Sequence, residues 1–314
     1  GVVAVVASGS AEPAVCSIGS GGVQVLSARR DLGLDAAWLP LPEAVRFPTS
    51  QGEEAHALVY PPTSPDHVVP DGERPPLIVL VHGGPTGSVR THLQLSIAYW
   101  TSRGFAVADV DYRGSTGYGR PYRHRLRNGW GVLDVDDCVA VALFLAERGG
   151  VDGMRLAIRG GSAGGFTVLS ALTFHDVFAA GASRYGVADL AALAADTHKF
   201  EARYLDRLVG RWPEDEAVYT ARSPIHHTDR LSTPMLLLQG AEDPIVPPDQ
   251  SRRMAKALRS RGVPCAYVEF PDEGHGFRKA SNIVRALEAE LAFFAQRFGF
   301  VPADDLPPLA VDGF

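Results

Sequence analysis

The sequence predicts an α/β fold built on a mostly parallel, doubly wound sheet with helices on both faces. Two observations predict this fold class. From residue 77 onward, short runs of continuous apolar residues alternate with segments of helical periodicity, which is typical of buried parallel strands joined by helices. The 314 residues are 46% hydrophobic and 21% charged, the balance of a globular protein with one large core.

The expected elements follow one another in regular order. Extended segments between residues 44 and 60 precede a proline-rich loop at 61–76. The expected strands are then 77–82, 105–111, 155–160, 180–186, 235–240 and 266–270, and the expected helices are 92–103, 135–148, one after Ser162, one after Pro248 and 281–298. Because parallel strands share one carboxyl edge, we expect the loops that follow them to meet there.

The first 30 residues have a different pattern. Three apolar runs, at 2–8, 14–18 and 23–27, are separated by Gly and Ser turns, which predicts a small antiparallel sheet. The first run is too short for a membrane span and lacks the basic flank of a secretory signal, so no membrane partner is expected. Because the chain starts without Met and within an expected strand, we expect it to begin partway through a longer protein.

Charge and cysteine content exclude several classes of function. The net charge is −6 and no basic cluster is present, so no nucleic-acid partner is expected. Cys16, Cys138 and Cys265 are odd in number and widely spaced, so neither a disulfide framework nor a zinc site is expected. We therefore expect a cytoplasmic protein without a bound metal.

The most informative motif is G-x-S-x-G at 160–164, centred on Ser162. It lies between an apolar strand and a helix that starts with small residues, which is the context of a nucleophile elbow. In an elbow the serine backbone is strained, and its neighbours are glycines because adjacent chain passes too close for a Cβ. The motif predicts an α/β-hydrolase fold with Ser162 as the nucleophile. In isolation it also fits a plain glycine-rich turn.

A serine nucleophile needs an imidazole base and a carboxylate that orients this base. Asp243 follows the expected strand at 235–240, and His275 follows the expected strand at 266–270. Both come after Ser162, in the order serine, acid, histidine that α/β hydrolases use. We therefore predict a triad of Ser162, His275 and Asp243.

Three other acidic residues lie next to the predicted partners. Glu242 is the alternative to Asp243, which we prefer because glutamate is the rarer acid in such triads. Asp272 and Glu273 precede His275 and are expected to be solvated turn residues.

Acyl transfer also requires hydrogen-bond donors for the negative charge that develops on the carbonyl oxygen. The H-G-G-P segment at 82–85 follows an expected strand, so the N–H of Gly84 is one candidate donor. The N–H of Ala163, directly after the nucleophile, is the second candidate. The alternative for the glycine segment is a tight turn without a catalytic role.

With these motifs the chain resembles the prolyl oligopeptidase family of serine peptidases, in its acylaminoacyl-peptidase and dipeptidyl-aminopeptidase branch. The resemblance covers roughly Pro42 to Phe300. The segments that carry it are HGGP at 82–85, DYRGSTGYG at 111–119, Trp130-Gly131 with Asp134 and Asp137, GGSAGG at 160–165, SPIH at 223–226 and EGHGF at 273–277. Several of these segments are specific to this family rather than to α/β hydrolases in general.

The resemblance implies that the chain has three parts. Residues 1–30 would be the terminal strands of a β-propeller, which covers the active site in such proteins. Residues 31–300 would be the catalytic domain and residues 301–314 a C-terminal tail. The propeller of the same longer chain would then be a partner of the catalytic domain and would limit access to short peptides.

The resemblance also implies a pocket for the residue before the scissile bond. Phe200 and Tyr204 match positions that line this pocket, and their spacing of four suits one face of a helix. An aromatic pair packed in the core is the alternative. Tyr185 and Val246 are further candidates for the same pocket.

One position departs from the pattern of the family. Members that place a tyrosine hydroxyl in the oxyanion hole carry that tyrosine where this chain has His82. The resemblance therefore implies that Gly84 donates from its backbone here.

We predict a serine peptidase that hydrolyses short peptides or aminoacyl amides, of the aminopeptidase or acylaminoacyl-peptidase type. It would act through an acyl-enzyme, without a cofactor or metal. The main alternative is a carboxylesterase-type ester hydrolase, since the same machinery cleaves esters. A further alternative is a non-catalytic binding module that keeps the hydrolase fold. A homo-oligomer is compatible with the sequence, which does not specify the oligomeric state.

Overall fold

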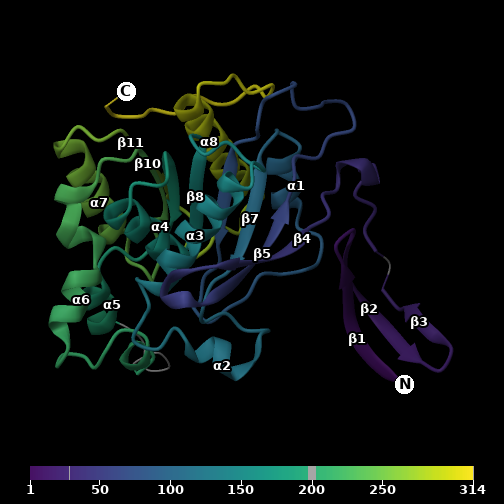
Figure 1. The fold of residues 1–314 in the computed structure, drawn as a ribbon, viewed down its shortest axis with the longest axis horizontal. Helices are drawn as coiled ribbons and strands as arrows, with labels where there is room; N and C mark the ends of the chain where they lie inside the picture. The colour runs from purple at the N-terminus through teal and green to yellow at the C-terminus, as the bar shows by residue number, and fades with distance from the viewer. Residues whose placement is uncertain (28, 197–202, 314) are drawn as a thin grey trace.

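The computed structural model describes residues 1–27, 29–196 and 203–313, and the centre of this part is an eight-stranded sheet (Figure 1). The strand order is β11-β10-β9-β8-β6-β7-β5-β4. Strands β6 to β11 run parallel to one another, while β5 pairs antiparallel with β7 and β4 antiparallel with β5. The strands are β4 (Glu43–Pro48), β5 (Glu54–Tyr60), β6 (Leu77–Val81), β7 (Ala106–Asp111), β8 (Leu156–Gly161), β9 (Ala180–Arg184), β10 (Met235–Gly240) and β11 (Cys265–Phe270).

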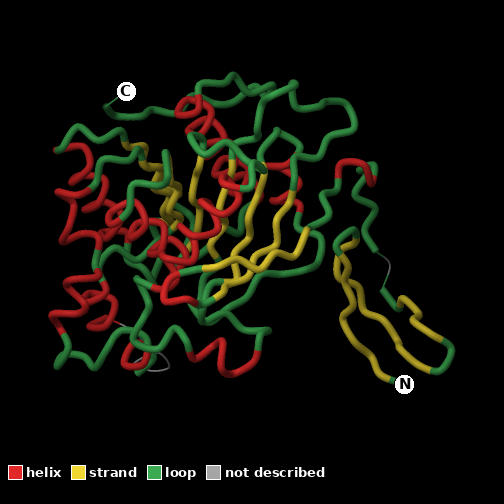
Figure 2. Tube along the Cα trace, in the orientation of Figure 1, coloured by secondary structure: helices red, strands yellow, loops and turns green. Residues whose placement is uncertain are grey.

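Helices cover both faces of this sheet (Figure 2). They are α1 (Leu95–Thr101), α2 (Gly119–His124), α3 (Leu133–Glu147), α4 (Ala163–Phe174), α5 (Leu190–Asp196), α6 (Glu216–Arg222), α7 (Pro248–Ser260) and α8 (Ala280–Phe298). Side chains of α3, α4 and α7 join the core on one face, and side chains of α1 and α8 join a second core on the other. Successive residues of β6 point to opposite faces of the sheet. Leu77 and Val79 therefore lie in the core with α3, α4 and α7, and Ile78 lies in the core with α1 and α8. The doubly wound α/β-hydrolase fold is therefore confirmed.

Three short helices in the described part of the chain, α2, α5 and α6, are not predicted by the sequence. Each has six or seven residues, too few for a hydrophobic period to be recognised. Helix α1 is shorter than the expected helix at 92–103, because Gln94 still has extended torsions (φ −124°, ψ 107°). None of the described helices has both the length and the apolar character needed to cross a membrane.

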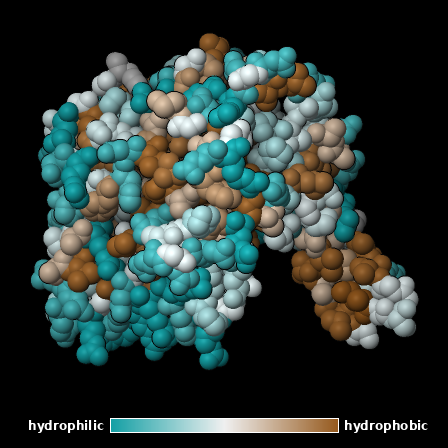
Figure 3. Space-filling view, viewed as in Figure 1, coloured by the Kyte–Doolittle hydropathy of each residue, from teal (hydrophilic) through white to brown (hydrophobic). Residues whose placement is uncertain are grey.

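The first residues form a separate antiparallel sheet, as the sequence predicts. Strand β1 (Val2–Ser8) pairs with β2 (Ala11–Gly19), and β2 pairs with β3 (Gly22–Val25). This sheet projects from the main body, and its visible surface is largely apolar (Figures 1 and 3). Val5 on β1 and Val23 on β3 are 71% and 61% exposed. The assignment of these strands to a β-propeller stays a prediction.

The segment after α8 packs on the main body of the structure. Leu306, Leu309 and Val311 contact the core of the α1 and α8 face. The backbones of Asp312 and Cys265 exchange two hydrogen bonds of 3.0 Å, so the tail adds a short bridge beside β11. The predicted boundaries at residues 30 and 300 stay predictions.

Candidate active site

Ser162 occupies a sharp turn between β8 and α4. Its backbone torsions are φ 57° and ψ −121°, outside the regions that L-residues adopt readily. A Cβ on Gly160 would lie 2.5 Å from the carbonyl oxygen of Gly164, and a Cβ on Gly164 would lie 2.2 Å from that of Val81. Glycine is therefore required at both positions, for the reason that the G-x-S-x-G motif suggests.

The structure brings the three predicted triad residues together. Nε2 of His275 lies 2.9 Å from Oγ of Ser162, and Nδ1 of His275 lies 2.8 Å from Oδ2 of Asp243. The three residues follow β8, β10 and β11 at the carboxyl edge of the parallel strands. With Nδ1 protonated and bonded to the carboxylate, Nε2 is free to accept the serine proton. The arrangement can therefore activate the hydroxyl of Ser162.

Backbone donors fix the carboxylate of Asp243. Its Oδ1 accepts hydrogen bonds from the N–H groups of Ile245 and Val246, each at 2.9 Å. Asp243 is 4% exposed, whereas Glu242 is exposed to solvent. The structure thus places Asp243, and not the alternative Glu242, against the imidazole.

The prediction that Glu273 is a solvated turn residue is wrong. Its side chain is 4% exposed, and its carboxylate accepts the N–H groups of Arg278 and Lys279 and the side-chain amide of Asn282. The histidine loop turns back into α8 and leaves backbone donors that this carboxylate satisfies. Asp272 is exposed, as predicted.

The loop after β6 presents glycine backbone near the elbow. Gly84 has φ +130°, and a Cβ added there would lie 2.7 Å from the backbone nitrogen of Thr86. The hydroxyl of Tyr112 donates to the carbonyl oxygen of Pro85 at 2.8 Å. The loop conformation is therefore specific to glycine and is held from the end of β7.

His82 directly precedes the glycines of the loop after β6. Its ring stacks on Tyr112 with centroids 4.3 Å apart, and its Nε2 lies 2.8 Å from Oγ of Ser115. Burial lowers the pKa of His82. We interpret His82 as a neutral side chain that supports the glycine loop.

A cavity of about 270 Å³ lies beside Ser162 and His275. Gly84 and Ala163, the two predicted oxyanion donors, lie in its wall. The other described wall residues are Pro85, Trp130, Val187, Leu193, Tyr204, Leu205, Ile245 and Val246. No carboxylate is among the described wall residues, so the cavity suits an uncharged, apolar side chain.

Two of the four predicted pocket residues lie in this wall. They are Tyr204 and Val246. Tyr204 lies in a turn, and Phe200 is outside the described residues, so the shared helix face that their spacing suits stays a prediction. Tyr185 is not among the described wall residues. Its ring packs edge-on against His275 with centroids 5.0 Å apart.

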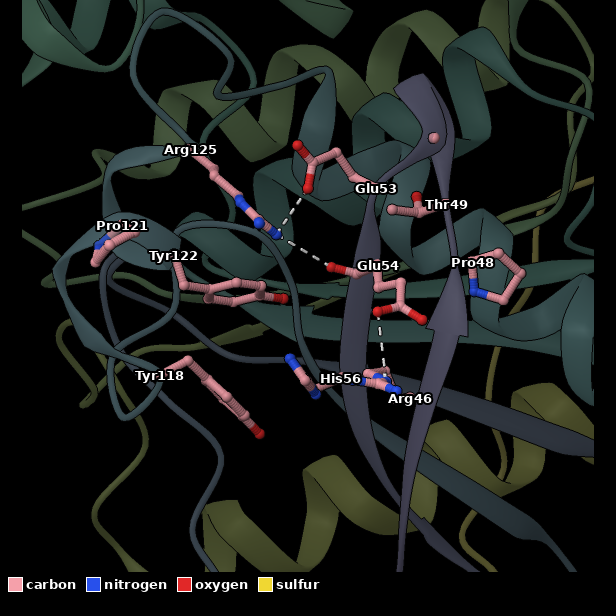
Figure 4. A pocket seen from close by; sticks show the side chains of 11 residues that line it. Arg46, Pro48, Thr49, Glu53, Glu54, His56, Tyr118, Pro121, Tyr122 and Arg125 are labelled. Carbon is pink, nitrogen blue, oxygen red and sulfur yellow. Dashed lines mark hydrogen bonds and ion pairs between the residues drawn. The ribbon is translucent and has the colours of Figure 1, made fainter.

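A second and larger cavity, of about 670 Å³, lies between β4, β5 and α2 (Figure 4). Its charged groups pair with one another: Arg46 lies 3.4 Å from Glu54, and Arg125 lies 2.9 Å from Glu53. Its described wall shares no residue with the cavity at Ser162. Ser162 and His275 of the predicted triad therefore line the smaller cavity and not the larger one.

The sequence from residue 91 to residue 300 matches the model of the prolyl oligopeptidase family, Peptidase_S9. This range includes Ser162, Asp243 and His275. The chain belongs to the prolyl oligopeptidase family. The resemblance that its motifs suggest is thereby confirmed.

Relatives in this family include peptidases of both predicted types. Dipeptidyl aminopeptidase BIII of Pseudoxanthomonas mexicana is 34% identical over 230 residues, which cover 71% of this chain and 33% of the relative. The acylamino-acid-releasing enzyme of Homo sapiens is 30% identical over 236 residues, which cover 71% of this chain and 31% of the relative. The chain thus spans about a third of the length of these relatives.

Two solved structures are similar over nearly the whole chain. The crystal structure of puromycin hydrolase has a TM-score of 0.95 at 49% identity and covers 98% of this chain and 47% of that chain. A puromycin-hydrolyzing peptidase of Mycobacterium tuberculosis has a TM-score of 0.95 at 48% identity, covering 99% of this chain and 47% of that chain. The chain spans less than half of either solved protein.

A buried ionic cluster near the turn at Ser162 is not predicted from the sequence. Glu290 of α8 is fully buried and lies 2.8 Å from Nε of Arg159 and 2.6 Å from Nη2 of Arg184. The signal that could have found it is a glutamate inside the apolar stretch at 289–295, because a charge within a buried helix face needs a partner.

Proposed function

We propose that this chain is the catalytic part of a serine peptidase that cleaves short peptides or aminoacyl amides. The observation that carries the proposal is the chain of contacts from Ser162 through His275 to Asp243, at 2.9 and 2.8 Å. Membership of the prolyl oligopeptidase family supports amide rather than ester bonds as the natural substrates. A carboxylesterase is the alternative, because the same triad cleaves esters.

The reaction begins when Oγ of Ser162 attacks the substrate carbonyl carbon while Nε2 of His275 takes the hydroxyl proton. The carbonyl electron pair moves to oxygen, where the N–H groups of Gly84 and Ala163 stabilise the negative charge. The tetrahedral intermediate collapses, the C–N bond breaks, and His275 gives its proton to the leaving amine. Water then attacks the acyl-enzyme by the same steps and releases the acid.

The cavity beside Ser162 selects the residue before the scissile bond by size and polarity. Its apolar wall favours an uncharged side chain. Because no carboxylate is among the described wall residues, recognition of a free α-amino group would come from another part of the protein, which we assign to the propeller. Since two solved relatives carry puromycin in their names, we include an aminoacyl amide of that kind among the substrates.

The setting of the enzyme is also part of the proposal. We place it in the cytoplasm, because Cys16, Cys138 and Cys265 are buried free thiols, as suits a reducing compartment. The partner of the catalytic domain is the N-terminal propeller of the same longer protein, and a homo-oligomer is compatible with this arrangement. The exposed apolar strands β1 to β3 would then be covered by the remaining propeller strands.

The test compares hydrolysis of three substrate types by the purified chain and its Ser162→Ala variant. The substrates are free aminoacyl p-nitroanilides, N-acylated aminoacyl p-nitroanilides and p-nitrophenyl esters. We expect amide turnover that is lost in Ser162→Ala, and the better of the two amides shows the terminus preference.

Two results would change the proposal. Ester turnover without amide turnover would move the assignment to an esterase. A folded protein that turns over neither and whose Ser162 resists covalent serine reagents would indicate a non-catalytic module.

A further inference from the structure

Tyr185 lies directly after β9, in a backbone conformation that residues with a side chain rarely adopt. Its φ is +39°, in the region that favours glycine. Its backbone N–H donates to the carbonyl oxygen of Leu238 in β10 at 2.7 Å. Backbone strain of this kind persists only where surrounding contacts hold it, and it is concentrated at functional sites. The side chain of Tyr185 is therefore a candidate for a role in the site.

The ring of Tyr185 contacts both the elbow and the loop that carries His275. A Cβ on Gly161, the residue before Ser162, would lie 3.0 Å from Cε2 of Tyr185, so the ring packs on the elbow backbone. The same ring packs edge-on against His275, with centroids 5.0 Å apart and planes at 62°. It also meets Phe277 edge-on, with centroids 5.2 Å apart and planes at 89°. Edge-on packing is a favourable arrangement of aromatic rings, so Tyr185 joins the elbow to the histidine loop.

The backbone beside His275 consists of glycine on both sides, Gly274 and Gly276. Glycine has more conformational freedom than any other residue, and Gly276 has φ +93°. A Cβ on Gly276 would meet nothing within 4 Å, so no neighbouring atom confines the loop at that point. The contacts of the imidazole itself therefore contribute much of its positioning.

We propose that Tyr185 is a positioning residue that holds the imidazole of His275 in line with Oγ of Ser162 and the carboxylate of Asp243. This inference rests on the proposed peptidase function. The two hydrogen bonds of His275 hold its ring nitrogens, and the edge-on contact with Tyr185 blocks sideways movement of the ring. A displacement of a reacting group by about 1 Å lowers a rate by about 100-fold, so such a restraint affects proton transfer.

The test replaces Tyr185 by leucine, which removes the flat ring, and by phenylalanine, which keeps it. Neither replacement is glycine, so all three proteins keep the same backbone strain. With the p-nitroanilide that the unsubstituted chain cleaves best, we expect Tyr185→Leu to lower kcat by about 10- to 100-fold. KM is expected to change less than about threefold, because Tyr185 is not among the described wall residues of the cavity at Ser162. Tyr185→Phe is expected to keep kcat within about threefold.

A second readout does not depend on peptidase activity. The rate at which a fluorophosphonate modifies Ser162 requires only the serine and its base. We expect this rate to fall in Tyr185→Leu by a factor similar to that for kcat and to be restored in Tyr185→Phe. Labelling without cleavage of any amide would count against the proposed peptidase function, while the labelling rates would still decide the role of Tyr185.

Tyr219→Leu is the matched control. Tyr219 is buried and packs edge-on against Trp212, with centroids 5.2 Å apart and planes at 61°, nearly the geometry of Tyr185 and His275. Neither Tyr219 nor Trp212 is among the described wall residues of the cavity at Ser162. The control is expected to lose thermal stability and to keep both rates in the folded protein.

Unchanged kcat and labelling rate in folded Tyr185→Leu would overturn the proposal. So would a rise in KM alone, which would make Tyr185 a substrate contact, or an equal loss in Tyr185→Phe, which would assign the role to the hydroxyl. If Tyr185→Leu does not fold, Phe277→Leu decides, because it removes one of the two loop contacts of the Tyr185 ring. We expect it to lower the labelling rate by about threefold or more, and an unchanged rate would overturn the proposal.

Discussion

The carboxylate of Glu290 receives two hydrogen bonds from the guanidinium of Arg184, at 2.7 and 2.6 Å. The same carboxylate binds Nε of Arg159 at 2.8 Å, so α8 is joined to both β8 and β9. Burial acts to raise the pKa of Glu290. The two guanidinium groups outweigh this effect and hold the pKa below its ordinary value. The carbonyl oxygen of Arg184 accepts the N–H of Ser162 at 3.0 Å, which links this cluster to the elbow.

We expect Glu290→Gln to destabilise the protein by about 3–5 kcal/mol, because it leaves two buried guanidinium groups without their anion. Urea unfolding followed by circular dichroism measures the change in the free energy of unfolding.

Glu54→Gln is the control for this substitution. The Arg46–Glu54 pair has side chains that are 66% and 54% exposed, and its loss is expected to cost less than about 1 kcal/mol. If Glu290→Gln were as mild as this control, the buried cluster would not stabilise the fold.

Asp109 gives the protein a specific pH dependence. Burial, with the charge of Asp111, raises the pKa of Asp109 from 3.8 to about 7. The folded state therefore keeps a proton that the unfolded chain releases near pH 4, so the contribution of Asp109 to stability falls as the pH rises from about 4 to 7. Above both pKa values this penalty is at most about 4 kcal/mol.

We expect Asp109→Asn to remove this penalty, because the amide does not ionise. Relative to the unsubstituted protein, the variant gains stability between pH 4.5 and pH 7.5 and gains little more at higher pH. Thermal melts of both proteins at several pH values give this difference. A difference in melting temperature that does not change with pH would contradict the raised pKa.

The elbow glycine Gly164 offers a sharp steric test. An added Cβ would lie 2.2 Å from the carbonyl oxygen of Val81, so Gly164→Ala must displace backbone and is expected to cost about 3 kcal/mol or more. In Gly150→Ala the new Cβ meets nothing closer than the carbonyl oxygen of Leu145 at 3.6 Å, so this control is expected to be nearly neutral. If both variants had the same free energy of unfolding in urea, the space beside Gly164 would be large enough for a Cβ, which would contradict the steric argument.

Local patterns in the sequence predict the features that depend on neighbouring residues. Continuous apolar runs predict the parallel strands, and the order of loops after them predicts that Ser162, Asp243 and His275 meet at one sheet edge. The spacing of Phe200 and Tyr204 stays a prediction, because Phe200 lies outside the described residues.

Features that depend on distant contacts are not visible in the sequence. Glu290 and Arg184 are 106 positions apart, and nothing next to either residue specifies their pairing. The burial of Glu273 likewise depends on how the histidine loop turns into α8. A charged residue in a loop or helix is usually solvated, so only the tertiary structure reveals these exceptions.

Asp243 and Glu242 form a natural pair for testing the acid of the triad. We expect Asp243→Asn to lower kcat by about 10³–10⁴-fold, because the amide no longer holds His275 in the tautomer that accepts the serine proton. Glu242→Gln removes an adjacent exposed carboxylate and is expected to change kcat less than threefold, roughly the scale of a weak surface effect. A larger loss in Glu242→Gln than in Asp243→Asn would reverse the assignment.

Covalent labelling shows whether Ser162 is a nucleophile activated by His275. The purified chain is treated with a fluorophosphonate, and the modified peptide is identified by mass spectrometry. We expect one adduct on Ser162, none in Ser162→Ala, and much slower labelling in His275→Ala. A folded protein that stays unlabelled, or an adduct on another serine that persists in Ser162→Ala, would contradict this assignment.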